Sequence, residues 1–383
     1  MKQEILLARS AGESCGAVVT GGALTDYRAA SAAAPSLVGG VYRARIRKML
    51  AGLAGAVVEI PGGEAWLDLG RAQSPKPQEG AAITVQIVQD GQGGKLPRAA
   101  AAPRIAGRFL ALQPGAAKPA LSHRISDNDA RARLGAVLAA LGDPGRGQFL
   151  ALHRAPEATD EMLRREAERL RKLWREAAPV LAGDGPAEAI APADPALDLL
   201  RVFLGPSVAR IAVDSEALAA IVRGWIVTHA PEWKGAVERE PVGRTTLESA
   251  AIRAELETAL APDVPLAGGG ALVIESAAAL TAIDVDTDRA AGASAKATFA
   301  MVNREAAAEI ARQIRLRNLG GRIVVDFAGL GPARELPAAL AILREGVAGD
   351  PMAVQIAKPS EFGLVEMIRR RERRTLAEMP RTR

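Results

Sequence analysis

The sequence has little of the residue types that most often build metal clips, acid–base pairs and aromatic surfaces. Cys15 is the only cysteine in 383 residues, so neither an intramolecular disulfide nor a zinc site of paired cysteines can form. The three histidines, His123, His153 and His229, are widely spaced and form no metal-binding pair at helical spacing. Aromatic residues make up only 3% of the chain, which limits how many bases its surface could stack. A reducing compartment fits this cysteine usage best.

Long hydrophobic runs are absent as well. No stretch of about 20 uncharged apolar residues occurs, and residues 1–7 lack the apolar core of a signal peptide. We therefore expect a cytoplasmic protein with no membrane segment. Lys and Arg number 49 against 44 Asp and Glu, and the resulting charge of +5 suits a polyanionic partner. The chain exceeds a usual single core and is 49% apolar, so several folded subdomains are expected.

The N-terminal part of the chain is rich in predicted β-strands. Apolar runs separated by Gly and Ser predict a β-meander over residues 1–35. Over residues 36–97, Gly and Pro separate short apolar runs, which is the rhythm of a small all-β barrel.

One strand of this barrel carries a row of arginines. Residues 41–47 alternate with period two, so Arg43, Arg45 and Arg47 are expected to share one strand face, with Trp66 nearby in the barrel. Such a face could follow a nucleic-acid backbone and stack a base. An ordinary charged solvent face is the other interpretation that the sequence leaves open.

The rest of the chain mixes helices and strands. Residues 98–194 include a charged amphipathic helix at 160–175, and a stretch rich in Pro, Ala and Gly at 178–195 is the best linker candidate. Residues 196–258 indicate helices with strands around residues 208–213, and residues 259–383 alternate between strand and helix.

The strongest chemical signal is a set of aspartates at the ends of two predicted strands. One apolar run leads into Asp284 and Asp286, and a second run ends in Asp326. Between them lies a predicted helix over residues 304–318, with Asn303 as its N-cap. A crossover of this length joins parallel neighbours, so we expect Asp284 and Asp326 at the same edge of one sheet.

Two carboxylates at one sheet edge repel each other unless a cation joins them. Mg²⁺ usually takes one or two carboxylates and keeps several waters and substrate phosphate oxygens. Such an ion can activate water and neutralise charge on an attacked phosphodiester. The spacing alone leaves a second interpretation open, in which Asp284 and Asp326 merely cap the turns after their strands.

Two rival motifs fail on their context. The Asp-x-Asp-x-Asp run from Asp284 imitates a calcium loop, but it lacks the glycine at the sixth position and the glutamate at the twelfth. Residues 12–16 satisfy a Gly-x-Ser-x-Gly pattern, but they fall between two strands, where a hairpin turn is expected instead of a nucleophile elbow.

A second basic region lies near the C-terminus. Residues 363–378 are predicted to form a helix with an apolar stripe and a cluster of arginines that includes Arg370 and Arg371. This density of positive charge favours contact with an anion.

Three segments together resemble the ribonuclease E/G family. Residues 279–286 are similar to the strand that carries the family's first catalytic aspartate. Residues 305–327 are similar to its helix, double glycine and second catalytic strand, and residues 362–367 to the segment that closes its catalytic domain. Weaker similarity runs back to residue 1.

The resemblance implies a multidomain α/β fold. A ribonuclease-H-like unit, residues 1–35 and 195–258, would be interrupted by an OB-fold RNA-binding barrel over 36–97 and a 5′-sensor-like region over 98–194. A deoxyribonuclease-I-like catalytic domain would follow over 259–383.

The resemblance also implies an activity. Mg²⁺ bound by Asp284 and Asp326, with Asp286 as an auxiliary acid, would hydrolyse phosphodiester bonds in single-stranded RNA during rRNA processing or RNA turnover. The arginines and Trp66 would guide the RNA; the residues so assigned are Arg43, Arg45, Arg47, Trp66, Arg370 and Arg371.

This chain also departs from the family pattern. Asp286 stands where an asparagine is usual, Glu361 where an arginine is usual, and Arg154-Ala155 where an arginine–threonine pair grips a 5′ monophosphate. The family's paired cysteines, which link subunits through zinc, are absent, so any homo-oligomer would form without a zinc link. Two alternatives stay open: a catalytically weak RNA-binding protein that retains the fold, and a phosphohydrolase of small molecules.

Overall fold

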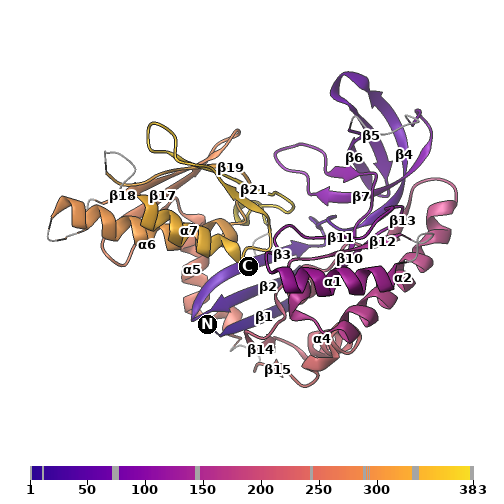
Figure 1. The fold of residues 1–383 in the computed structure, drawn as a ribbon, viewed down its shortest axis with the longest axis horizontal. Helices are drawn as coiled ribbons and strands as arrows, with labels where there is room; N and C mark the ends of the chain where they lie inside the picture. Colours follow the sequence, from indigo (N-terminus) through magenta and orange to yellow (C-terminus); the bar gives the residue numbers. More distant parts are fainter. Residues whose placement is uncertain are drawn as a thin grey trace. The chain divides into compact units, whose positions relative to one another are not determined.

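The computed structural model describes most of the chain and divides it into two compact units. The described residues are 2–10, 13–70, 77–142, 147–241, 245–287, 290, 292, 294–329 and 336–379. Unit 1 comprises Met1–Ala34, Val202–Gly224 and Trp233–Arg383, and unit 2 comprises Pro35–Arg201 and Trp225–Glu232 (Figure 1). No described helix has the length and apolar character needed to cross a membrane.

The first sheet of unit 1 contains the predicted N-terminal meander. Its strands are β1 (Gln3–Ser10), β2 (Glu13–Thr20), β3 (Ala23–Ser31), β14 (Val208–Val213) and β15 (Val237–Arg239), in the order β15-β14-β1-β2-β3. The meander is antiparallel, whereas β14 pairs parallel with both β1 and β15. The helices α3 (Pro195–Phe203), α4 (Glu216–His229) and α5 (Ala250–Leu260) belong to the same stretch of chain as β14 and β15.

The second sheet of unit 1 carries the strand-end aspartates. Its order is β16-β17-β18-β19-β21-β20. The bounds are β16 (Asp263–Pro265), β17 (Ala271–Ser276), β18 (Thr281–Asp286), β19 (Gly321–Asp326), β20 (Val354–Ile356) and β21 (Val365–Arg369). Helices α6 (Ala295–Leu316) and α7 (Leu336–Ala348) lie along one face of this sheet (Figure 1).

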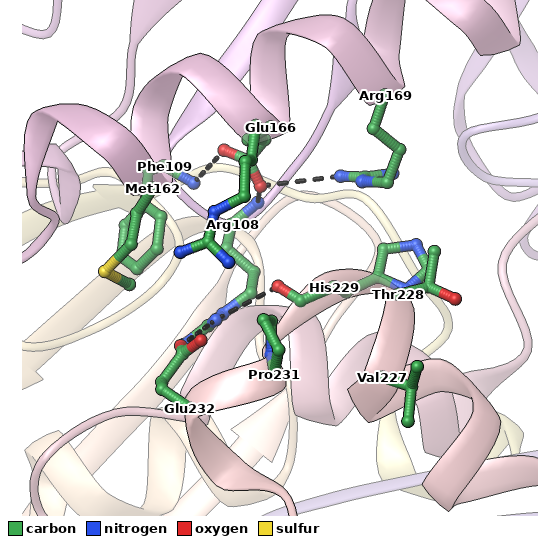
Figure 2. A pocket seen from close by; sticks show the side chains of 11 residues that line it. Arg108, Phe109, Met162, Glu166, Arg169, Val227, Thr228, His229, Pro231 and Glu232 are labelled. Atoms are coloured by element: carbon green, nitrogen blue, oxygen red, sulfur yellow. Dashed lines mark hydrogen bonds and ion pairs between the residues drawn. The ribbon is translucent and has the colours of Figure 1, made fainter.

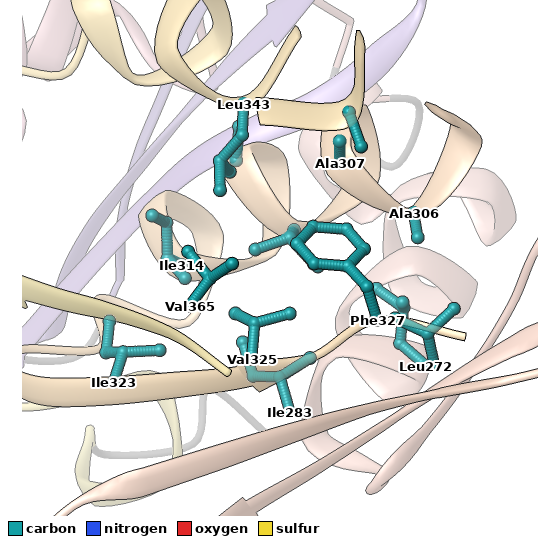
Figure 3. Packing of buried hydrophobic residues seen from close by; sticks show 14 of the residues in the cluster. Leu272, Ile283, Ala306, Ala307, Ile314, Ile323, Val325, Phe327, Leu343 and Val365 are labelled. Carbon is teal, nitrogen blue, oxygen red and sulfur yellow. The ribbon is translucent and has the colours of Figure 1, made fainter. Parts of the chain in front are cut away.

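Only one face of this second sheet is buried. Figure 3 shows Ile283, Val325 and Val365 of the central strands meeting Ile314 of α6 and Leu343 of α7. These side chains are almost fully buried, whereas the alternate residues of β18 and β19 are exposed or half-buried. Because successive side chains of a strand point to opposite faces, the packing of α6 and α7 decides which residues of the sheet reach solvent.

Helix α6 begins earlier than the sequence predicts. Ser294 caps it by accepting a hydrogen bond from the Ala297 backbone amide, so the helix starts at Ala295 and the prediction of Asn303 as N-cap was wrong. Asn303 instead lies inside the helix, 1% exposed, and exchanges two hydrogen bonds of 2.9 Å with the backbone of Ala328. The sequence pattern favoured Asn303 as the N-cap because Asn is common at N-cap positions. An Asn inside a helix is also accommodated when its buried amide forms hydrogen bonds with another segment of the chain.

The predicted helix over 363–378 was also wrong. The segment forms strand β21 followed by a short 3-10 helix, Leu376–Glu378. In β21, Val365, Met367 and Arg369 are buried and Glu366 and Ile368 are exposed, which is period two. Pairing with β19 on one side and β20 on the other determines this conformation, and neither partner is visible in the local sequence pattern.

Unit 2 contains the predicted barrel. The strands β4 (Val41–Leu50), β5 (Gly55–Ile60), β6 (Gly63–Asp68), β8 (Arg98–Ala100) and β7 (Ala82–Gln89) follow one another in the sheet, and β4 pairs with β7 to close it. The predicted small all-β barrel is thereby confirmed, and the structure shows it as a closed, OB-like barrel of five strands. Strand β13 (Ala187–Ile190) also pairs antiparallel with β4.

A four-stranded sheet and two helices make up the rest of unit 2. The sheet contains β9 (Ile105–Ala106), β10 (Leu110–Gln113), β11 (Ala120–Leu121) and β12 (Gln148–Ala151), and the helices are α1 (Asn128–Leu141) and α2 (Asp160–Ala182). Helix α2 was predicted but extends further, and with β13 it orders much of the stretch at 178–195. That stretch is therefore not the open linker that its composition favoured.

Candidate active site

The structure brings Asp284 and Asp326 side by side. Strands β18 and β19 are parallel neighbours, and their register pairs Asp284 directly with Asp326. Adjacent strands lie about 4.8 Å apart, and residues paired in register point to the same face. Both aspartates are exposed, while Ile283, Val285 and Val325 are buried. The prediction of parallel neighbours with two acids at one edge is confirmed.

Two local features hold this edge in place. The buried stripe of α6 packs beneath β18 and β19, and Asn303 of the same helix binds the backbone of Ala328, two residues beyond Asp326. The helix is itself tied to the first sheet of unit 1 and to α5, because Arg312 donates hydrogen bonds to the Leu24 carbonyl of β3 at 2.8 Å and to Glu255 of α5 at 2.7 Å. Asn303 is thus a positioning residue that the sequence had assigned to a helix cap.

Among the residues that the structure describes, no cationic side chain pairs with either carboxylate. Neither Asp284 nor Asp326 makes a hydrogen bond or ion pair with any described residue. Asp286 ends the same strand, lies half-buried on the same face, and pairs with Ala271 of β17. The described residues contain no group of three or more His, Cys, Asp or Glu gathered as a metal cage.

This donor set fits magnesium better than a metal that needs a full protein cage. Mg²⁺ takes hard oxygen ligands and is commonly bound by one or two carboxylates, with water and phosphate oxygens in the remaining positions. Two adjacent, exposed carboxylates meet that requirement, whereas zinc would require four nitrogen or sulfur donors in a structural site.

The barrel places the predicted arginines differently from expectation. Arg43 is 7% exposed, and its guanidinium donates hydrogen bonds to the carbonyl oxygens of Val180, Asp184 and Gly185. It anchors the end of α2 and the turn that follows, so it does not share an exposed face with Arg45 and Arg47. This corrects the sequence expectation, which could not detect that β13 would cover the start of β4.

Arg45 and Arg47 remain at the surface. Arg45 is exposed, and Arg47 forms an ion pair with Glu59 at 3.0 Å. A register shift between Ile46 and Lys48 breaks the strict alternation of β4 at Arg47.

Trp66 lies half-buried in β6, where Gly55 leaves room for its ring: a Cβ on Gly55 would come within 2.2 Å of it. The strand pairings place Lys48, Val57, Trp66 and Arg98 in one row across β4, β5, β6 and β8. Sequence reasoning missed Lys48 and Arg98 because only the register makes them neighbours of Trp66.

The two C-terminal arginines differ in their surroundings. The Arg370 side chain is 52% exposed and its Nε lies 3.2 Å from a Glu372 carboxylate oxygen. The Nε of Arg371 donates to the Gly320 carbonyl at 3.2 Å. Both residues are exposed, but the Arg371 guanidinium is engaged with the turn that precedes β19.

A separate hollow of about 120 Å³ lies within unit 2 (Figure 2). Arg108 pairs with Glu232 at 2.6 Å, and Arg169 lies 3.4 Å from Glu166. Glu166 also accepts hydrogen bonds from the backbone amides of residues 108, 109 and 110. Burial and the neighbouring Arg169 lower the pKa of His229 to about 4. None of the predicted site residues lines the hollow, and its charges largely compensate one another, so we assign it a structural role.

Comparison with known proteins agrees with the geometry. The sequence matches the model of the family described as Ribonuclease E/G family over residues 104–372. It is 29% identical over 399 residues to ribonuclease G of Haemophilus influenzae, covering 97% of this chain and 80% of that protein. It is 27% identical over 402 residues to ribonuclease G of Escherichia coli, covering 98% and 81%. It is 33% identical over 311 residues to ribonuclease E of a Nostoc species, covering 78% of this chain and 44% of that protein. With the family model covering well over half of its length, this chain belongs to the ribonuclease E/G family.

Proposed function

We propose that this chain is an endoribonuclease that hydrolyses phosphodiester bonds in single-stranded RNA with Mg²⁺ held between Asp284 and Asp326. The observation that carries the proposal is the in-register pairing of two exposed aspartates on parallel strands of a ribonuclease E/G family member; neither pairs with a cation in the part of the chain that the structure describes. Two such carboxylates attract a divalent ion and, through it, a phosphate group.

The chain's own residues have distinct parts in this mechanism. Asp284 and Asp326 would hold the ion at the sheet edge, and Asn303 holds the end of β19 in place through Ala328. Bound there, Mg²⁺ would neutralise charge on the scissile phosphodiester and lower the pKa of a water molecule. Asp286 is the auxiliary acid beside this pair.

The RNA path that we propose uses residues whose side chains are exposed or, for Trp66, half-buried. Arg45 and Arg47 would contact the phosphate backbone at the barrel, Trp66 would stack a base, and Arg370 would add positive charge in the catalytic unit. Lys48 and Arg98 extend the same barrel row. Arg43 and Arg371 are better explained as structural contacts.

The finer domain assignment is also a proposal. Residues 1–35 and 195–258 would form the ribonuclease-H-like unit, 36–97 the OB-fold barrel, 98–194 the 5′-sensor-like region, and 259–383 the deoxyribonuclease-I-like catalytic domain. The five-stranded first sheet, the closed barrel and the second sheet with helices on one face support this division. The cellular role would be rRNA processing or RNA turnover in the cytoplasm.

Recognition of the RNA 5′ end should be weak. Arg154 forms an ion pair with Glu157 at 2.6 Å, and Ala155, which offers no hydroxyl, is fully buried. The pair that would grip a 5′ monophosphate is therefore both incomplete and partly neutralised.

The decisive experiment measures cleavage by the purified full chain. A fluorescent, AU-rich single strand is incubated with and without Mg²⁺, and Asp284→Asn and Asp326→Asn are compared with Glu275→Gln, an exposed acid of β17 to which we assign no role. We expect each aspartate variant to lower kcat by on the order of 100-fold or more, and Glu275→Gln to leave it unchanged. Metal-independent cleavage, or cleavage that survives both aspartate substitutions, would defeat the site assignment.

A second candidate function rests on Asp286. Its carboxylate stands where the family pattern has an amide, and the extra negative charge beside the metal pair would oppose a phosphate. The chain would then be a catalytically weak RNA-binding protein. In that case RNA binding is retained with little metal-dependent cleavage, and Asp286→Asn raises the cleavage rate. A phosphohydrolase of small molecules would instead show no dependence on RNA length in a length series.

A further inference from the structure

One aromatic side chain of this protein is fully presented to solvent. Phe362 is 90% exposed, whereas every other aromatic residue of the chain, all of which fall among the described residues, is buried or half-buried. Moving a phenylalanine side chain from water to a buried site raises the equilibrium constant for burial by a factor on the order of ten or more. An exposed ring is therefore unfavourable unless a ligand covers it.

A closed turn holds Phe362 at its tip. The Gly363 amide donates to the Ser360 carbonyl at 2.9 Å, and the Ser360 amide donates to the Leu364 carbonyl at 2.9 Å. The Leu364 amide also donates to the Ser360 hydroxyl at 3.2 Å. Gly363 has φ +85°, which a residue with a Cβ rarely adopts, so glycine permits the turn. The phenylalanine is presented on a defined backbone.

This turn lies at the sheet edge that carries the aspartates. It connects β20 to β21, and β21 runs antiparallel to β19, with its first residue, Val365, paired with Val325. Val325 directly precedes Asp326, which pairs with Asp284. Phe362 precedes Val365 by three residues, so its Cα lies within roughly 11 Å of Val365 along the chain.

We propose that Phe362 stacks on a nucleobase of single-stranded RNA beside the phosphodiester held at Asp284 and Asp326, and thereby positions the strand for cleavage. This inference rests on the proposed function and adds a base contact to it. Lys358 is exposed in the same connection and supplies a positive charge for the RNA backbone. Glu361 is also exposed beside Phe362, so the tip is one aromatic ring among charged neighbours and not a continuous apolar patch of the kind that protein interfaces use. A lone ring beside a cation is the usual platform for an unpaired base.

The test separates stacking from chemistry. Phe362→Ala and Phe362→Trp are compared with Val227→Ala, a matched loss of an apolar side chain that is 60% exposed on α4. Binding of a fluorescein-labelled single strand is measured by anisotropy in the Asp326→Asn background, and KM and kcat are measured in the otherwise native chain. We expect Phe362→Ala to raise Kd and KM about tenfold with kcat within about twofold, Phe362→Trp to restore both, and Val227→Ala to change neither.

Abasic RNA identifies the contact. The base is removed from one nucleotide of the RNA at a time, and Kd is measured for the native chain and for Phe362→Ala. We expect the two Kd values to become equal only when the missing base is the one next to the cleaved bond. Equal RNA affinity of the native chain and Phe362→Ala overturns the inference. If Phe362→Ala also changes the oligomeric state while RNA affinity stays the same, Phe362 contacts a protein and not a base. If the native chain binds RNA without cutting it, the proposed nuclease function fails while the anisotropy comparison still decides the base contact. The melting curve of Phe362→Ala should match that of the native chain because the side chain is exposed.

Discussion

Two consecutive arginines near the C-terminus should respond in opposite ways to the same substitution. The Arg369 side chain is 4% exposed and binds the fully buried Asp350 through Nε at 2.8 Å and Nη2 at 3.2 Å. Its Nη1 also donates to the Asn318 side chain at 3.0 Å and to the Leu319 carbonyl at 2.8 Å. The neighbouring Arg370 is half exposed and has an ion pair with Glu372 at the surface.

The structure sets the size of the effect. Arg369→Met removes the cation from a buried pair and leaves Asp350 charged at zero exposure, which costs about 3–5 kcal/mol in the free energy of unfolding. Arg370→Met removes a solvated pair and should cost less than about 1 kcal/mol. RNA affinity should show the reverse pattern, because only Arg370 keeps a guanidinium in solvent.

The assay is urea unfolding of the full chain followed by circular dichroism, together with RNA binding by anisotropy. A double variant, Arg369→Met with Asp350→Leu, should recover much of the stability lost by Arg369→Met, since it removes the orphaned charge. If Arg369→Met is no less stable than Arg370→Met, the buried network does not support β21 as we argue. If the double variant is as unstable as Arg369→Met, the loss comes from packing instead of charge.

Three further predictions concern pH, base contact and the RNA 5′ end. Burial and Arg169 lower the pKa of His229 to about 4, so between roughly pH 6.5 and 4 the unfolded chain binds a proton that the folded chain does not. The free energy of unfolding should therefore fall as the pH drops through this range, and His229→Gln should flatten that fall in urea titrations; an unchanged slope would contradict it. Trp66→Ala should weaken binding of single-stranded RNA about tenfold, whereas Trp66→Phe should retain most of the affinity in anisotropy titrations; equal loss in both variants would point to folding and not stacking. RNA with a 5′ monophosphate and RNA with a 5′ hydroxyl should be cleaved at rates within about twofold of each other, since Ala155 replaces the hydroxyl donor; a strong preference in initial rates would refute this.

Local patterns in the sequence predicted much of the architecture. Strand alternation and Gly and Pro spacing located the meander, the closed barrel and the strands that end in Asp284 and Asp326, because these signals depend on residues close together in the chain. The crossover length was enough to predict that the two strands are parallel neighbours.

Tertiary structure decided what those signals could not. In the sequence pattern Arg43 has the same spacing as Arg45 and Arg47, yet β13 and the end of α2 bury its side chain. Residues 363–378 satisfy a helical stripe, yet pairing with β19 and β20 makes the first part a strand. Whether an arginine meets solvent or a buried carboxylate, and whether an aromatic ring is covered or presented, depends on segments far away in the chain. The sequence by itself determined which residues carry the acidic, basic and aromatic side chains of the proposed site, while packing between distant segments determined which of them are exposed.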